Sequence, residues 1–124
     1  KQYLKIPSNT KLLYIILSNN FSSFLAFDRI DYARETLELF ETGYAQNTPH
    51  LAAHIDFIFN KGLLAFKENR PEDGNKHCQN AIKICQDFHQ TEYEKIYTKR
   101  YENWRLGYNN PEFKEVSIGA GFFD

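Results

Sequence analysis

The chain has 124 residues, with 15 lysines and arginines, 16 acidic side chains and a net charge of −1. This length suits one domain with one sizeable core, and the balanced charge argues against a dominant surface for nucleic-acid phosphates. The longest apolar runs fall far short of the roughly 20 residues that a membrane-spanning helix needs, and no signal-peptide pattern is visible. We therefore expect a cytoplasmic protein, and because the chain contains no methionine, we expect it to be an excerpt of a longer one.

Apolar side chains recur at helical spacing almost throughout, and no segment alternates with a period of two for long enough to predict a sheet. The first helix is predicted over residues 8–27, with residues 18–20 as the point where it is interrupted or bent. A second helix is predicted to start at Asp28 or Asp31 and to end at Gly43. Its buried stripe is expected to comprise Ala33, Leu37, Phe40 and Tyr44.

The third helix is predicted to open at Thr48-Pro49. Apolar residues cover more than half of its circumference, so we expect neighbouring helices on both sides of it. The fourth helix, over residues 71–88, has a narrower apolar stripe, which is typical of an outer helix that packs on one side only. That stripe comprises Cys78, Ala81, Ile82, Cys85 and Phe88.

A fifth, aromatic-rich helix is predicted over residues 91–105, because glycine and proline break the periodicity beyond it. Residues 106–124 are expected to form an irregular tail, with at most a short helix over residues 112–116. We therefore predict an all-α array of about five to six antiparallel helices that forms a single helical-repeat domain over residues 1–124.

Gly62, Gly74 and Ala81 have the spacing of the three small residues in a tetratricopeptide helix–turn–helix unit. Glycine inside a helix costs roughly 1 kcal/mol relative to alanine, so two glycines in strongly helical segments indicate close packing. Pro71 lies between them at the first turn of a helix, where its missing N–H is harmless. These residues predict a tight hairpin of the third and fourth helices within a right-handed, tetratricopeptide-like array.

The candidate metal and redox groups do not form a site in the sequence. His50 and His54 are four residues apart, as in a zinc-protease helix, but the catalytic glutamate and a third ligand are missing. Cys78 and Cys85 lie seven residues apart on one predicted helix, too far for a disulfide, and we interpret them as small core residues. We expect no metal, no cofactor and no enzymatic activity.

The more specific polar candidate is Asn60, two residues before Gly62 on the crowded third helix. A buried or groove-facing amide needs partners for its donors and its acceptor, and an extended peptide backbone offers both. The alternative is that Asn60 bonds neighbouring side chains or water. Lys67 and Arg100 are candidates to supply positive charge at the same groove for a carboxylate.

The segments at residues 12–20, 59–66 and 81–85, together with Gly74, resemble the C-terminal half of Rgg/MutR/GadR-type transcription regulators. The resemblance covers residues 10–105. It implies a repeat domain whose concave face binds a short signalling peptide, in the quorum-sensing manner of Gram-positive bacteria. It also implies a homodimer, and contact with DNA only through a helix-turn-helix domain outside this chain.

The resemblance also assigns individual groove positions. Asn60 falls where tetratricopeptide grooves use an asparagine to hold peptide backbone, and the groove-facing side of the same helix is expected to carry Asp56, Phe59, Leu63 and Lys67. The tryptophan, leucine, tyrosine and closing proline positions of that pattern hold Ile58, Lys61, Ala65 and Gln86.

A second hypothesis is a constitutive protein–protein interaction scaffold of tetratricopeptide type. In that case the repeats bind a permanent partner or form only a homodimer, and the aromatic fifth helix is a protein–protein interface instead of a wall of the peptide groove.

Overall fold

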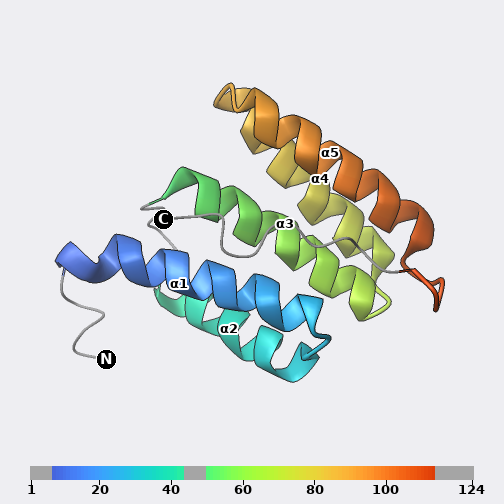
Figure 1. The fold of residues 1–124 in the computed structure, drawn as a ribbon, viewed down its shortest axis with the longest axis horizontal. Coiled ribbons are helices and arrows are strands. Elements are labelled where there is room, and N and C mark those ends of the chain that lie inside the picture. The colour runs from blue at the N-terminus through green and yellow to red at the C-terminus, as the bar shows by residue number, and fades with distance from the viewer. Residues whose placement is uncertain (1–6, 44–49, 114–124) are drawn as a thin grey trace. The chain divides into compact units, whose positions relative to one another are not determined.

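The computed structural model describes residues 7–43 and 50–113 of the chain. Within these ranges it contains no strand, and its helices are α1 (Pro7–Ala26), α2 (Ile30–Gly43), α3 (Leu51–Lys67), α4 (Pro71–Asp87) and α5 (Thr91–Gly107) (Figure 1). The predicted all-α fold is therefore confirmed. In the described part of the chain no helix has the length and apolar character needed to cross a membrane.

The chain divides within α3, between Phe57 and Ile58, into two compact units. The first unit contains α1, α2 and the start of α3, and the second contains the rest of α3 with α4 and α5. In the first unit α1 packs on α2, and in the second α4 packs on α5, as adjacent antiparallel helices (Figure 1).

Aromatic rings form the core of the first unit. The ring of Phe40 stacks on that of Phe57 with centroids 4.0 Å apart, and Tyr14 meets Phe40 edge-on at 5.0 Å. Phe21, which is fully buried, lies 5.6 Å from Phe57. Rings buried in this way contribute large apolar areas to the packing of α1, α2 and the start of α3.

The predicted interruption of α1 at residues 18–20 is wrong, because α1 is continuous from Pro7 to Ala26. Ser18 is fully buried, and its hydroxyl donates a hydrogen bond of 3.2 Å to the backbone carbonyl of Ala53. A serine inside a helix usually competes with the helical backbone for hydrogen bonds. Here its hydroxyl has a partner on α3, so the helix is not disturbed.

Close backbone approach joins α3 and α4 in the second unit. A Cβ atom on Gly62 would lie 2.5 Å from Cys78 Sγ and 2.9 Å from the carbonyl oxygen of Gly74. A Cβ atom on Gly74 would lie 2.8 Å from the ring of Phe66. Ala81, two turns further along α4, is completely buried. At Gly62 and Gly74 even an added methyl group would clash with the facing helix.

The three helix–helix turns that the structure describes, α1–α2, α3–α4 and α4–α5, have the same backbone geometry. Each contains one residue with a positive φ angle, which is 62° at Asp28, 62° at Asn69 and 56° at His89. The residue after it donates its N–H to a carbonyl five residues earlier, with distances of 2.7 Å, 2.8 Å and 2.7 Å in the three turns. This is the Schellman arrangement that satisfies the last carbonyls of a helix. The repetition of one turn agrees with an array of repeated helix pairs.

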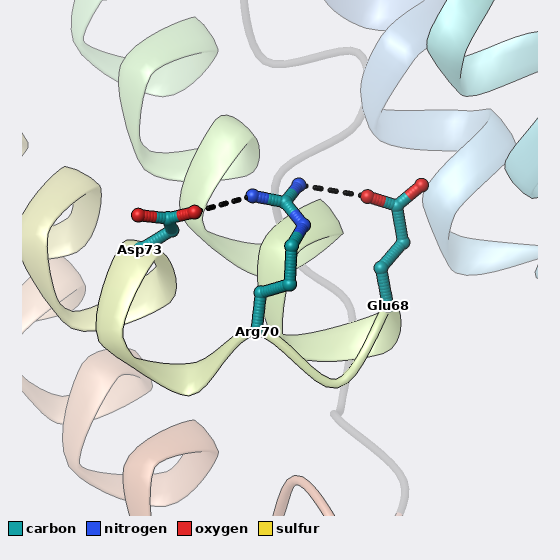
Figure 2. Close-up of polar contacts among 3 residues, drawn as sticks. All are labelled: Glu68, Arg70 and Asp73. Atoms are coloured by element: carbon teal, nitrogen blue, oxygen red, sulfur yellow. Dashed lines mark hydrogen bonds and ion pairs between the residues drawn. The ribbon is translucent and has the colours of Figure 1, made fainter.

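Arg70 holds the turn between α3 and α4. Its guanidinium donates one hydrogen bond of 2.7 Å to Glu68 and another of 2.6 Å to Asp73, so one side chain joins the end of α3 to the first turn of α4 (Figure 2). The hydrogen bond that Arg70 donates to Glu68 is the main cause that raises the pKa of Arg70. Pro71 follows at the first position of α4, as predicted.

Several predicted boundaries differ from the structure. Helix α4 ends at Asp87, and Phe88, predicted to be in its buried stripe, is 57% exposed because it lies in the turn after the helix. Helix α5 continues to Gly107, beyond the predicted end at residue 105. Tyr44, Thr48 and Pro49 lie outside the described residues, as does most of the short helix predicted over residues 112–116.

Candidate functional site

The facing sides of α3 and α5 bring together aromatic rings and a buried cation. The rings of Phe59 and Tyr97 lie 4.8 Å apart. The guanidinium of Arg100 lies 4.8 Å from the centroid of Phe59 and 5.7 Å from that of Tyr97, with only 8% of the residue exposed. The negative faces of the two rings compensate part of the cost of removing this cation from water.

A second contact between a cation and an aromatic ring lies about two turns further along α3 and α5. The ammonium group of Lys67 lies 5.3 Å from the ring centroid of Trp104, which is 6% exposed. Phe66 stacks on Trp104 at 6.2 Å, and Phe113 meets it edge-on at 5.0 Å. We call Phe59, Lys67, Tyr97, Arg100 and Trp104 the aromatic–cation stripe.

Trp104 also carries an unusual donor. Its buried Nε1–H has no hydrogen-bond acceptor among the residues that the structure describes. Most buried donors in native proteins are paired, so this indole N–H would gain a hydrogen bond from a ligand acceptor that reached it after the covering groups moved.

The remaining predicted groove residues of α3 are buried. Asn60 is 1% exposed, Leu63 2% and Asp56 0%. Asn60 and Asp56 both have interaction partners in the structure. Asp56 belongs to the first unit, and Asn60 and Leu63 to the second. A peptide therefore reaches the amide of Asn60 only if the groups that cover it move.

With this geometry in place, one comparison identifies the family. Residues 1–99 match the family model described as the C-terminal domain of the HTH-type transcriptional regulator Rgg. The chain belongs to this family. Comparison with the curated proteins and with the solved structures found no significant match.

The resemblance to Rgg-type regulators is thus confirmed, and the family is one of transcription regulators. Within the aromatic–cation stripe, the matched residues of this Rgg C-terminal domain include Phe59, Lys67 and Tyr97. Arg100 and Trp104 follow directly after the matched region, on the continuation of α5.

The two histidines of α3 have structural partners in this Rgg C-terminal domain. His50 Nδ1 accepts a hydrogen bond of 3.1 Å from the N–H of Ala53, which caps the start of α3. The hydroxyl of Tyr14 lies 3.0 Å from His54 Nδ1, and burial lowers the pKa of His54. No group of three His, Cys, Asp or Glu side chains in the described ranges is placed to hold a metal ion.

Sequence reasoning assigned Phe59, Lys67 and Arg100 to one groove, and the structure brings Phe59 and Arg100 into contact. It did not assign Tyr97 and Trp104 to the site. The signal that could have found them is the seven-residue interval between them, which matches the interval between Phe59 and Phe66 and so predicts two aligned pairs.

Proposed function

We propose that this Rgg C-terminal domain binds a short signalling peptide and forms a homodimer that transmits the binding event to the DNA-binding part of the regulator. The aromatic–cation stripe is the observation that supports this proposal most directly. Peptide binding would shift the population between two arrangements of the dimer, and thereby change transcription. The role is that of a cytoplasmic quorum-sensing receptor in a Gram-positive bacterium.

The chemistry of the stripe suits a short apolar peptide that carries a carboxylate. The rings of Phe59, Tyr97 and Trp104 are 0%, 4% and 6% exposed, so they offer apolar surface to hydrophobic side chains once the groups that cover them move. Lys67 and Arg100 offer positive charge for an acidic side chain or the free C-terminus of the peptide.

The amide of Asn60, next to Phe59 on α3, supplies both a donor and an acceptor for extended peptide backbone. Asp56 and Leu63, about one turn to either side of Asn60, extend the same face of the helix. We therefore propose Asp56, Phe59, Asn60, Leu63, Lys67 and Arg100 as the peptide-binding residues.

The direct test is a titration with short hydrophobic peptides, followed by calorimetry and by fluorescence. Trp104 is the chain's only tryptophan, so its emission reports on the stripe itself. Wild-type protein is expected to bind with a saturable fluorescence change, and Arg100→Gln is expected to weaken binding by about 1.5–3 kcal/mol, as for loss of a hydrogen bond to a charged group.

Arg105→Gln is the matched control, because Arg105 lies on the same helix but is exposed and pairs with Glu102. Circular dichroism checks that each variant is folded. If Asn60→Ala binds the peptide as tightly as wild type, the role given to Asn60 is wrong. Absence of binding to every peptide of a hydrophobic set would contradict the proposal as a whole.

A constitutive interaction scaffold is the second candidate function, and one observation favours it. Leu12 and Ile16, one turn apart on α1, are 55% and 43% exposed, which is typical of a surface that another chain covers. If the domain is a constitutive scaffold, its association state should be the same with and without peptide. Sedimentation equilibrium with and without peptide separates the two functions, and Leu12→Glu would disrupt the association in the scaffold case.

A further inference from the structure

A cavity of about 520 Å³ opens where α3 meets α4 in the second unit, and none of its lining residues belongs to the aromatic–cation stripe. Its wall on α3 is made by Ile58 and Lys61. These two residues stand where the tetratricopeptide pattern has tryptophan and leucine. A smaller side chain and a polar one therefore replace two large apolar ones, and the resulting space falls within the size range of small-molecule sites, about 300–1,000 Å³.

The wall on α4 carries regularly spaced polar groups. Lys76, Asn80 and Lys83 line the cavity and lie four and three residues apart, so they share one face of the helix. The two lysines are about 10 Å apart along the helix axis, given a rise of 1.5 Å per residue. Lys83 also contacts Asp87 at 3.3 Å, but this ion pair is exposed and hence weak, so a multiply charged anion can compete with it.

The cavity has a positive local charge. None of its seven lining residues bears a carboxylate, and three of them are lysines, which carry the charge. Burial lowers the pKa of His77, and the charges of Lys61 and Lys76 lower it further, while Asp73 acts in the opposite direction. The side chain of Gln79 is fixed by a hydrogen bond of 3.1 Å to the hydroxyl of Tyr101 on α5, which holds this wall in place.

We propose that this cavity binds a small phosphate-bearing anion with at least two anionic groups. Two lysines separated along one helix face can neutralise two such groups at once, and Asn80 between them can donate amide N–H bonds. Lysine acts as a compact point charge, and a phosphate group carries a charge of about −1.5 to −2 near pH 7 against −1 for a carboxylate, so lysines without an arginine favour phosphate through its greater charge. The site is independent of peptide binding on α3 and α5.

The test uses the 124-residue chain and sodium tripolyphosphate, with calorimetry at constant ionic strength. One molecule is expected to bind per chain. The double variant Lys76→Gln/Lys83→Gln is expected to lose about tenfold or more in affinity, since two charge-assisted contacts are removed. Sodium citrate, whose carboxylates each carry less charge than a phosphate group, is expected to bind about tenfold more weakly than tripolyphosphate.

The matched control is Lys95→Gln/Lys99→Gln, which removes the same charge from exposed positions of α5. Equal weakening in the two double variants would show general attraction of an anion to a less positive protein, and would overturn the proposal. Absence of tripolyphosphate binding at millimolar concentration would also overturn it. Equal affinity for citrate would refute the phosphate assignment.

Discussion

At the residue scale, position 62 requires glycine because neighbouring atoms leave no room for a side chain, and not because of its backbone conformation. The nearest atoms to an added Cβ belong to Cys78 and to the backbone of Gly74, and the latter cannot move without shifting α4. Overpacking of this kind typically costs about 1–3 kcal/mol. Alanine is favoured over glycine in a helix by only about 1 kcal/mol, so the steric cost decides the outcome.

We therefore predict that Gly62→Ala lowers the free energy of unfolding by about 1–2 kcal/mol, the steric cost less the gain in helix propensity. Gly43→Ala is the control, because an added Cβ there meets no atom within 4 Å, and it should leave stability unchanged or raise it by a few tenths of a kcal/mol. Urea unfolding followed by circular dichroism measures both. A Gly62→Ala variant as stable as Gly43→Ala would contradict the close approach of the two helices.

The contact between Phe59 and Arg100 shows which part of the candidate site a sequence pattern can predict and which part it cannot. Sequence spacing gave the face of α3 on which Phe59 lies, because that depends only on the helical repeat. It did not give the partner on α5, because the rotation and offset of two helices depend on how all their side chains interlock. Nor did it give the unpaired indole N–H of Trp104, which depends on every group packed around it.

At the scale of elements, the repeated turn explains how α2 follows α1, and how α4 and α5 follow α3, with short connections. Each turn reverses the chain through one residue in the left-handed region, and Asp28 and Asn69 occupy equivalent positions 41 residues apart. Ala33 and Gly74, each buried and five residues further along, repeat the same interval. The turn and the small residue after it therefore belong to one structural repeat.

His89 occupies the left-handed position of the third turn, which a side chain other than glycine or asparagine occupies at a cost of about 1 kcal/mol or more. We predict that His89→Gly raises the free energy of unfolding by about 1 kcal/mol. Glu92→Gly, three residues later in the first turn of α5, should instead lower it by about 1 kcal/mol. Thermal or urea unfolding distinguishes the two, and destabilisation by His89→Gly would contradict this assignment of the turn.

The helices themselves could be predicted to within a few residues. Pro71 fixed the start of α4, and the apolar spacing fixed its buried face, because both act locally. The error at Phe88 arose because an apolar residue in register with a stripe looks helical even where the backbone has already turned. The error at residues 18–20 arose because the partner of Ser18 is on another helix, outside any local pattern.

At the scale of the whole molecule, each compact unit contains a partly buried histidine. Burial lowers the pKa of His54 in the first unit and of His77 in the second. The unfolded chain, with a histidine pKa near about 6.5, then binds more protons than the folded chain at mildly acidic pH. The stabilising effect of the neutral histidines is fully present above that pKa and is lost as the pH falls towards the lowered folded values.

We predict that the free energy of unfolding decreases between pH 7.5 and pH 5.5, a window that spans the ordinary histidine pKa of about 6.5. The double variant His54→Gln/His77→Gln should show a flatter dependence, because the groups responsible no longer titrate. Asn109→Gln, which replaces one non-titrating side chain by another at an exposed position, is the control and should retain the wild-type slope. Urea unfolding at several pH values measures the slopes, and an unchanged slope in the double variant would refute the assignment.

The close contact of α3 and α4 also provides a built-in chemical reporter. Cys78 and Cys85 are the only cysteines of the chain, and both are completely buried on α4. Burial raises the pKa of Cys85 to about 11, so little thiolate forms near neutral pH. Because the thiolate is the reactive form, we expect the cysteines to be alkylated only when α4 transiently separates from its neighbours. The labelling rate of the unmodified protein therefore measures how often this helix opens.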